Sequence, residues 1–521
     1  MVKSLIPAVF IAALLIAACD ADKLDSGLAI TDVIAYGDSQ SSGYPVTTKL
    51  RIRFNDDVHG LKADDVKLNA AFIILKHGFT RTGPAVYELG ITPGGGGQVM
   101  VGLDPYNPSG WKWNAKKVDV YAVFHFTGTS ALTITRYNGT GDAVIPDQIA
   151  GMPVTAIGDG AFNNRAITSL AIPNTVEKIG RYAFANNKLE KAAIPGSVKS
   201  IGFGAFSHNE LGEVGISDGL KSIGDEAFSY NRLTGVDIPR SVTSIGRFAF
   251  ANNQFTRIGV HDGVTYIGDG AFANNRLTSA DIPENAEIIR SSIFSNNLLD
   301  RVMIPGKVTY IGSYAFDYNQ LKGVIIPDSV TFIGNRAFAS NMLANVTFSD
   351  GIETIGSGAF AYNQLKSITL PAGVKSIMDG AFENNYLTQI VIPGGVTLIK
   401  KNAFSNNKLT SITIGGSVTS IEDYAFAYNN LTSITIGGGV TSIGAYAFMD
   451  NQLANVTIPR SVTSIGEHAF RNNQLTRITI GEEVSLGGYS FGDGFEASYN
   501  ASRKAAGVYS RVGTGWKFSA P

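Results

Sequence analysis

The sequence IPRSVTSIGRFAFANNQFTRIG, from Ile238 to Gly259, indicates the fold, because close copies of it follow one another along most of the chain. Each copy is anchored by a Phe, nearly always preceded by Ala. Fifteen such Phe residues, from Phe162 to Phe470, recur every 22 residues without slippage. A period of this size is typical of a solenoid in which each repeat forms one short supersecondary unit. The chain is therefore predicted to be mainly β, with a stack of about 15–16 coils around one continuous core.

The coil around Phe404 illustrates what one repeat predicts. The alternation of Ile412, Thr413 and Ile414 predicts a short strand with both Ile side chains inward and the Thr outward. The run Val396–Ile399 predicts a second short strand. The segment between these two strands is too short for a standard helix, so we expect a single helical or 3₁₀ turn there. Parallel pairing between successive coils then builds the stack at about 4.8 Å per coil.

An Asn stands three residues after the Phe in fourteen of the fifteen repeats, and only Arg165 departs from this. Asn tolerates a left-handed turn, and its amide can satisfy backbone groups of the neighbouring coil, so a structural ladder is predicted. A ligand-binding row of amides is the alternative. The ladder consists of Asn187, Asn209, Asn231, Asn253, Asn275, Asn297, Asn319, Asn341, Asn363, Asn385, Asn407, Asn429, Asn451 and Asn473. Gly residues four before the Phe, as at Gly180 and Gly246, are predicted to turn the chain without a Cβ.

The pattern I-P-x-S-V-T-x-I-G-x-x-A-F-x-x-N-x-L-T-x-I-x resembles the BspA-like class of bacterial leucine-rich repeats. The resemblance covers roughly residues 128–518. It implies a leucine-rich-repeat solenoid on a bacterial surface protein that adheres to host proteins, extracellular matrix proteins or other cells. The family often carries Cys where this chain carries the Asn ladder, so ligands are not transferred in detail from other members.

The first residues predict export and a lipid anchor. Residues 1–18 have a basic start and an apolar run that is too short for a normal membrane span, which is typical of a signal peptide. The sequence Ile16-Ala17-Ala18-Cys19 resembles a bacterial lipobox, which implies cleavage before Cys19 and diacylglyceryl attachment to its thiol. An ordinary signal peptide with a chance Cys is the alternative. Cys19 is the only cysteine, so no disulfide can form within the chain, and residues 19–27 are predicted to be the lipidated end and its tether.

Residues 28–124 lack the repeat and contain short alternating runs separated by turn signals such as Gly94–Gly97. Six or seven strands in this length predict an immunoglobulin-like β-sandwich, and FNDDVHGLKADDVKL resembles bacterial Ig-like modules. We expect this module to be a spacer, and ligand binding by it is left open. The runs are residues 29–35, 49–54, 71–76, 86–91, 98–103 and 118–124.

The solenoid is predicted to span residues 153–483, between an N-terminal cap at 125–152 and a C-terminal cap at 484–521. End coils must cover apolar edges and unpaired strand groups. The C-terminal cap is expected to bury Tyr509 and Trp516. One repeat is degenerate: Ala286, Arg290 and Ile293 replace the usual Val, Gly and Ala near Phe294, and we expect a local kink or bulge there.

The candidate binding site is a run on the row six residues before each Phe. This row is mostly Ser, but four consecutive coils carry Tyr266, Ile288, Tyr310 and Phe332. Large apolar side chains on a polar row predict an exposed patch for a partner, and partial burial of the row is the alternative. A second outward row, nine residues after the Phe, would suit ice binding, but Thr is also simply a good strand residue. This row reads Thr347, Thr369, Val391, Thr413, Thr435, Thr457 and Thr479.

The function predicted from these observations is a non-catalytic, lipid-anchored envelope protein, at the outer membrane or cell surface, that presents the solenoid to a protein or glycan. A formal net charge of −1 gives no electrostatic reason to bind nucleic acid, and the six scattered His residues have no metal-ligand spacing. No motif of a cofactor site interrupts the repeat. A structural or self-associating envelope protein is the alternative, and an enzyme acting on envelope glycans is a remote one, which an off-pattern acidic pair would favour.

Overall fold

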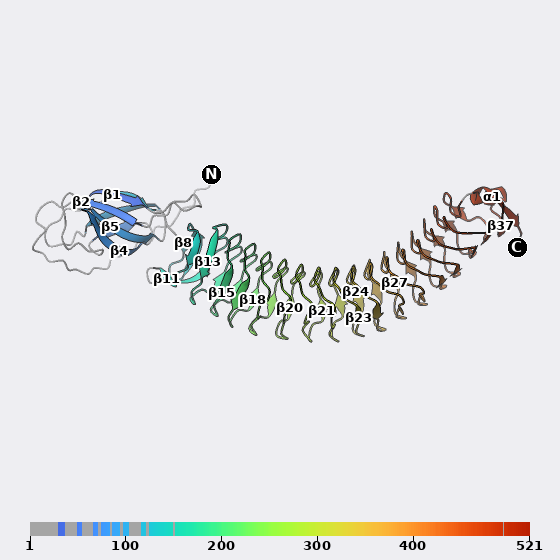
Figure 1. The fold of residues 1–521 in the computed structure, drawn as a ribbon, viewed down its shortest axis with the longest axis horizontal. Coiled ribbons are helices and arrows are strands. Elements are labelled where there is room, and N and C mark those ends of the chain that lie inside the picture. Colours follow the sequence, from blue (N-terminus) through green and yellow to red (C-terminus); the bar gives the residue numbers. More distant parts are fainter. Residues whose placement is uncertain are drawn as a thin grey trace, which may run out of the picture. The chain divides into compact units, whose positions relative to one another are not determined.

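A computed structural model describes residues 124–149, 152–492 and 494–520 with their side chains, preceded by the backbone of seven strands between residues 30 and 120 (Figure 1). The chain divides into two compact units, residues 1–232 and 233–521, each described by itself below. In both units, short strands follow one another coil by coil in sequence order.

The seven strands before the repeats form two antiparallel sheets. One sheet has the strand order β1-β2-β5-β4 and the other β3-β6-β7. The alternating runs in the sequence predict most of these strands but miss β3. The strands are β1 (Ile30–Tyr36), β2 (Lys49–Phe54), β3 (Val66–Ala70), β4 (Ile74–Gly83), β5 (Val86–Pro93), β6 (Gly97–Leu103) and β7 (Lys116–Val120).

A β-hairpin lies at the start of the repeats. β8 (Phe124–Thr127) pairs antiparallel with β9 (Leu132–Tyr137), and β9 pairs parallel with β12 (Met152–Ile157) of the first coil. The ring of Tyr137 stacks at 4.8 Å on the ring of Phe162. The hairpin thus covers the first Phe of the core. Two short strands accompany it: β10 (Gly141–Val144), parallel to β13 (Ile167–Ala171), and β11 (Gln148–Ile149), antiparallel to β12.

Every coil after the first carries a two-residue strand that begins six residues before the Phe. Within each unit these strands pair in parallel with those of the neighbouring coils, except between β20 and β21. In the first unit they are β14 (Lys178–Ile179), β16 (Ser200–Ile201) and β18 (Ser222–Ile223). In the second unit they are β19 (Ser244–Ile245), β20 (Tyr266–Ile267), β21 (Ile288–Ile289), β22 (Tyr310–Ile311), β24 (Phe332–Ile333), β26 (Thr354–Ile355), β27 (Ser376–Ile377), β28 (Leu398–Ile399), β30 (Ser420–Ile421), β32 (Ser442–Ile443), β34 (Ser464–Ile465) and β36 (Ser485–Leu486).

Several coils carry a second strand after the Phe, as the alternation predicts. In Ser411–Ile414, both Ile side chains are buried while Ser411 and Thr413 are exposed. In the first unit these strands are β13, β15 (Lys191–Ile194) and β17 (Glu213–Ile216). In the second unit they are β23 (Gly323–Ile325), β25 (Asn345–Thr347), β29 (Ser411–Ile414), β31 (Ser433–Ile436), β33 (Asn455–Thr457) and β35 (Arg477–Ile480).

The core is a column of stacked Phe rings. The repeat Phe side chains are at most 1% exposed, and within each unit the ring centroids of neighbouring coils lie 4.9 to 6.0 Å apart. The residue before each repeat Phe, which is Ala in every repeat but one, packs around this column together with the Ile of nearly every two-residue strand. This packing explains why these positions are apolar. Burial of about 100 or more Å² of aromatic surface per coil supplies much of the driving force for stacking.

The segment between the two strands forms neither a helix nor a 3₁₀ turn, so that expectation was wrong. Around Phe404, the N–H groups of Ala403 and Ser405 close turns within the coil, onto Lys400 and Asn402. The Phe404 N–H instead donates to the next coil, at 2.9 Å from the carbonyl of Ala425. Since every second N–H pairs with a neighbouring coil, no continuous helical ladder can form.

Two residues of each coil have left-handed backbone, namely those two before and two after the Phe, in all fifteen repeats. The ladder Asn, three after the Phe, does not, so its predicted left-handed turn was also wrong. The Gly four before the Phe has no positive φ either. An ideal Cβ on Gly334 would lie 2.5 Å from the backbone nitrogen of Ser313, so close approach of two coils, rather than a turn, requires this glycine.

The repeats end in a compact C-terminal cap of α1 (Phe495–Ala501), β37 (Gly507–Val512) and β38 (Gly515–Ser519). β37 pairs antiparallel with both β35 and β38. Tyr509 is fully buried as expected, whereas Trp516 remains partly exposed. The other large buried side chains of the cap are Phe495 and Tyr499, and the Tyr499 hydroxyl donates to the carbonyl of Gly481 at 2.7 Å. Within the described part of the chain, no helix is long and apolar enough to cross a bilayer.

Candidate functional site

The four apolar residues of the candidate patch are the first residues of consecutive two-residue strands. Tyr266, Ile288 and Tyr310 are exposed by 37%, 48% and 38%, while Phe332 is half-buried. Ile288, Tyr310 and Phe332 lie in direct parallel register on β21, β22 and β24. They therefore form a continuous apolar strip on a row that other coils fill mostly with Ser.

Aromatic contacts hold this strip in place. The rings of Tyr310 and Phe332 stack with centroids 5.0 Å apart and an interplanar angle of 3°. The guanidinium of Arg290 lies 4.5 Å from the ring centroid of Tyr266, within the range of a cation–π contact. The strip thus presents a rigid stacked pair, an exposed Ile and a Tyr capped by Arg290. Of these residue types, Tyr and Arg are enriched among those that carry most of the binding energy at interfaces.

The degenerate repeat interrupts the strand pairing beside this strip. β20 and β21 do not pair, although their neighbours on both sides do. One coil later, the Gly312 N–H donates to the Ile289 carbonyl at 2.7 Å, whereas within the described residues Arg290 forms no equivalent bond to Ile267. An ideal Cβ on Gly312 would lie 2.5 Å from a backbone nitrogen of the neighbouring coil, so the side chain of Arg290 does not fit this close approach. At this repeat the structure therefore shows a loss of strand pairing between β20 and β21, where the sequence predicts a kink or bulge.

The coils of β21 and β22 also expose apolar side chains after the Phe, on a row whose apolar residues the sequence did not single out. Met303 and Ile325 are exposed by 78% and 71%. They occupy the row nine residues after the Phe, and Val391 on that row is exposed by 80%. From Thr347 onward this row consists of Thr apart from Val391, so its apolar residues lie mainly in the two preceding coils.

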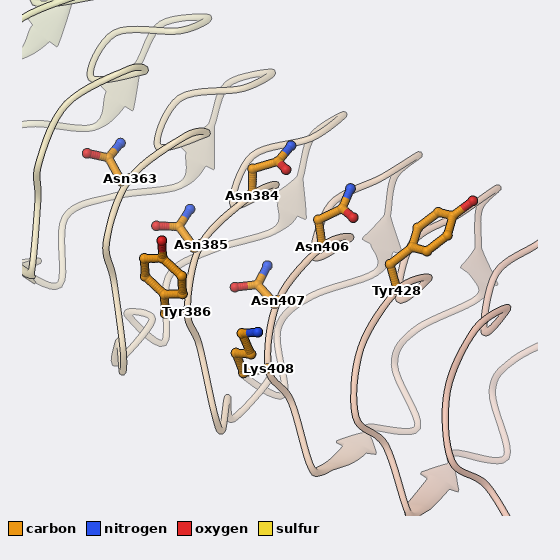
Figure 2. Close-up of a pocket in the computed structure, with 8 residues that line it drawn as sticks. All are labelled: Asn363, Asn384, Asn385, Tyr386, Asn406, Asn407, Lys408 and Tyr428. Carbon is orange, nitrogen blue, oxygen red and sulfur yellow. The ribbon is translucent and has the colours of Figure 1, made fainter.

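An open groove of about 330 Å³ lies further along the second unit (Figure 2). Three ladder residues, Asn363, Asn385 and Asn407, are among its lining. Its other lining residues sit two or four positions after a repeat Phe: Asn384, Asn406 and Tyr428 on one row, and Tyr386 and Lys408 on the other. The sequence analysis did not single out either row, because their residues vary from coil to coil.

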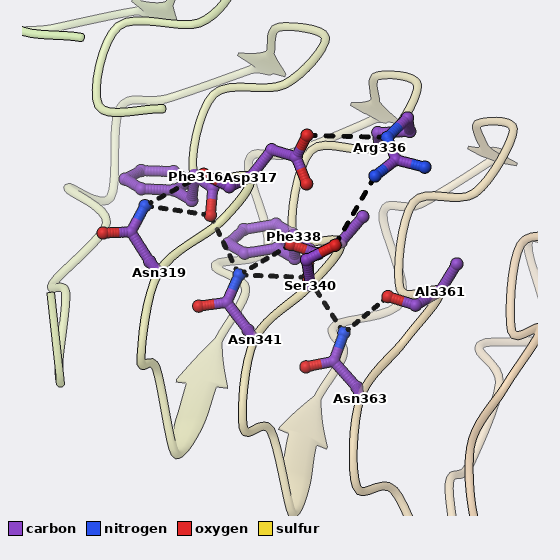
Figure 3. Close-up of polar contacts among 10 residues, drawn as sticks. Phe316, Asp317, Asn319, Arg336, Phe338, Ser340, Asn341, Ala361 and Asn363 are labelled. Atoms are coloured by element: carbon purple, nitrogen blue, oxygen red, sulfur yellow. Dashed lines mark hydrogen bonds and ion pairs between the residues drawn. The ribbon is translucent and has the colours of Figure 1, made fainter. Parts of the chain in front are cut away.

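The ladder amides are buried and saturated with backbone partners (Figure 3). The Asn341 Nδ2 donates to the carbonyls of Phe316 at 2.9 Å, Phe338 at 3.2 Å and Ala339 at 3.1 Å. Its Oδ1 accepts the N–H of Leu321 at 3.0 Å. Each Phe carbonyl also accepts from the Asn of its own coil, so the amides tie neighbouring coils together. This geometry gives the ladder a structural role and leaves no free amide proton for a ligand.

Two carboxyl groups depart from the row of small residues that follows each Phe. Asp317 is 3% exposed, and its Oδ2 pairs with the Arg336 Nε at 3.5 Å (Figure 3). Burial raises the pKa of the Asp317 carboxyl, although Arg336 opposes the rise. Burial likewise raises the pKa of Glu383, which lies three coils later. At parallel-strand spacing the two are about 14 Å apart, farther than the roughly 5–10 Å of paired catalytic carboxylates.

Cys19, the predicted lipidation site, lies outside the described residues. Within the described part, no three His, Cys, Asp or Glu side chains gather as a metal site.

The BspA type leucine rich repeat region matches residues 155–278, 221–341, 265–387 and 375–495. The chain belongs to the BspA-type leucine-rich repeat family. This family points to a non-enzymatic repeat protein, of a type that generally binds other proteins through its solenoid. No curated protein matches the sequence.

Several solved leucine-rich repeat structures are similar to this BspA-type chain. A leucine-rich repeat protein from Bacteroides ovatus is 26% identical over 71% of this chain and 90% of its own, with a TM-score of 0.43. A leucine rich cell surface protein from Faecalibacterium prausnitzii is 26% identical over 73% and 95%, with a TM-score of 0.35. The pneumococcal vaccine antigen PcpA is 18% identical over 70% and 96%, with a TM-score of 0.42.

Proposed function

We propose that this chain is a lipid-anchored adhesin of the cell surface that binds a protein partner through the apolar strip of Tyr266, Ile288, Tyr310 and Phe332. The observation that carries the proposal is the exposure of Tyr266, Ile288 and Tyr310, with Phe332 half-buried beside them, on a row that other coils fill mostly with Ser. Exposed apolar patches with aromatic anchors mark interaction sites, because burial against a partner removes their apolar surface from water.

The geometry of the strip indicates that its apolar side chains serve binding to a partner rather than folding of the solenoid. The strip needs no Tyr or Phe to pair its strands, since Ser occupies the same position in β16, β18 and β19. The stacked rings of Tyr310 and Phe332 lose little side-chain entropy on binding, because they are already held against each other. Arg290, held against Tyr266, adds a cation at the edge of the strip.

The test is binding of the purified full-length chain to matrix proteins and intact cells. We expect the triple variant Tyr266→Ser, Tyr310→Ser, Phe332→Ser to lose binding at least tenfold while its thermal unfolding stays cooperative. A matched triple variant with Ser200→Ala, Ser222→Ala and Ser420→Ala on the same row should bind normally. Unchanged binding by the first variant would remove the strip as the site. Self-association without partner binding would favour a structural envelope protein instead.

The lipid anchor and the Ig-like module belong to the same proposal. The lipobox-like sequence before Cys19 supports acylation of its thiol, and each buried CH₂ of such chains adds about 0.8 kcal/mol of membrane affinity. A Cys19→Ser variant should leave the membrane fraction, and its retention there would contradict the anchor. The sheet orders β1-β2-β5-β4 and β3-β6-β7 match the ABED and CFG sheets of immunoglobulin constant domains, which supports a β-sandwich spacer.

A further inference from the structure

The groove of Figure 2 has a rim of polar side chains that are unused within the protein. On the row two after the Phe, the Asn296 amide donates to the Asn274 Oδ1 at 2.9 Å, and the Asn472 amide donates to the Asp450 Oδ1 at 2.9 Å. Within the described residues, the side chains of Asn384 and Asn406 form no such bond, although they occupy the same row in adjacent coils. Two neighbouring amides are therefore free to donate and accept.

The other rim residues are free in the same way. Tyr386 and Tyr428 are exposed by 50% and 44%, and within the described part of the chain their hydroxyls form no hydrogen bond. Lys408 is exposed and has no carboxylate partner there, in contrast to Lys400, whose Nζ lies 3.0 Å from Glu422. The rim thus combines two amides, two phenols and one cation around one groove.

The floor of the groove, formed by the ladder residues Asn363, Asn385 and Asn407, offers no free hydrogen-bonding groups to a ligand. The Asn385 amide donates to the carbonyls of Phe360, Phe382 and Glu383, and its oxygen accepts the N–H of Leu365. The other two floor residues of the ladder are saturated in the same way. A ligand would therefore be held by the rim, on a floor that the repeat itself keeps rigid.

We propose that this groove binds a carboxylated glycan, with Lys408 pairing the sugar carboxylate and Asn384 and Asn406 bonding the ring hydroxyls. Amides suit hydroxyl groups, because each offers both a donor and an acceptor. Tyr386 and Tyr428 offer ring surface for the apolar C–H face of a sugar and hydroxyls for its polar edge. The single cation argues against a polyanionic peptide, which would need several, and the charge-assisted bond from Lys408 selects acidic over neutral sugars.

This site is distinct from the apolar strip, so the test of glycan binding is independent of the test of adhesion to a protein. The test is calorimetric titration of the full-length chain with galacturonic-acid oligosaccharides, neutral galactose oligosaccharides of the same length and polyglutamate. We expect the acidic oligosaccharide to bind at least tenfold more tightly than the neutral one. Absence of acidic-sugar binding, or equal or tighter binding of polyglutamate, would overturn the proposal.

Substitutions test which side chains of the groove contact the sugar. Lys408→Gln should lower affinity for the acidic sugar to that of the neutral one. The double variant Asn384→Gly, Asn406→Gly should weaken both sugars at least tenfold, and Gly keeps the left-handed backbone of these positions, with φ of 55° and 53°. Lys188→Gln is the matched control, because Lys188 is exposed at the same repeat position in another coil. Unchanged acidic-sugar affinity in Lys408→Gln, or an equal loss in Lys188→Gln, would place binding elsewhere.

Discussion

Substitution of a single ladder residue tests whether hydrogen bonds between coils hold this solenoid together. Asn319 is 7% exposed, and its Nδ2 donates to the carbonyls of Phe294 at 2.9 Å, Phe316 at 3.1 Å and Asp317 at 3.2 Å. Its Oδ1 accepts the N–H of Leu299 at 3.0 Å. The informative variants are Asn319→Ala, which removes both functions, and Asn319→Asp, which keeps the acceptor and loses the donors.

The magnitude follows from which groups lose every partner. The Phe294 carbonyl keeps a bond from Asn297 at 3.2 Å, and the Phe316 carbonyl keeps one from Asn341 at 2.9 Å. Only the Leu299 N–H is left unpaired in Asn319→Ala, and one buried unpaired group costs about 1–3 kcal/mol. With the lost bonds to the carbonyls, we expect Asn319→Ala to lower the free energy of unfolding by about 2–4 kcal/mol.

Asn319→Asp should be at least as harmful at pH 7, by about 3–5 kcal/mol, because its carboxylate would face three carbonyl oxygens without a cation. Burial and these oxygens raise the pKa of the new carboxyl, so stability is lost as the pH rises through that pKa and recovers when the pH falls. At low pH the protonated group donates one hydrogen bond again.

The assay is urea unfolding of the full-length chain, followed by circular dichroism at pH 7 and pH 4. Gln320→Ala is the matched control, since Gln320 is the exposed neighbour of Asn319 and its loss should change stability by less than about 0.5 kcal/mol. The reasoning is refuted if Asn319→Ala costs no more than Gln320→Ala, or if Asn319→Asp matches the native chain at pH 7.

Three further predictions concern the core and the contacts between coils. Asp317→Ala should raise the free energy of unfolding at pH 7 by about 1–2 kcal/mol, because the native carboxyl is buried with one oxygen unpaired. Burial raises the Asp317 pKa, so the free energy of unfolding of the native chain should increase as the pH falls through that pKa, and the advantage of Asp317→Ala over the native chain should shrink. Urea unfolding from pH 7 to pH 4 measures this difference, and an advantage that grows at low pH would contradict the prediction. Gly334→Ala should cost about 1–3 kcal/mol in the same urea assay because its Cβ would meet backbone at 2.5 Å, whereas Gly323→Ala, with 3.6 Å to the nearest atom, should be neutral. Phe360→Ala, which opens a gap in the Phe column, should cost about 3–5 kcal/mol by thermal or urea unfolding, and a loss below about 1 kcal/mol would mean that the column is not the core.

The positions that hold the core could be predicted from the sequence because burial requires apolar side chains at fixed spacing. The Phe column, the inward Ile side chains of β29 and the irregularity at Arg290 all follow from the repeat alone. The backbone of the turn did not, since the left-handed residues at its two corners are Tyr, His, Arg or Asn far more often than Gly. Their residue types do not predict a left-handed turn, because contacts with the neighbouring coil impose this backbone conformation.

Of the two candidate sites, one could be predicted from the sequence and the other could not. The apolar strip could be found because four residues break a polar row in consecutive coils. The polar groove could not, because Asn384 and Lys408 are ordinary surface residues until the coils place them beside Tyr386 and Tyr428. Free amides also cannot be told from bonded ones in a sequence, as the contrast of Asn384 with Asn296 demonstrates.

That this chain is a stack of 22-residue coils with a Phe core follows from its repeat alone, because a short unit with one apolar face can bury that face only against its own copies. The family follows from the repeat as well. The role of each polar position depends on the fold: which Asn ties coils together, which Gly permits close approach, where strand pairing is lost and which side chains remain free at the surface. Those properties depend on distances between residues 20 to 25 positions apart, and only the stacking of coils sets these distances.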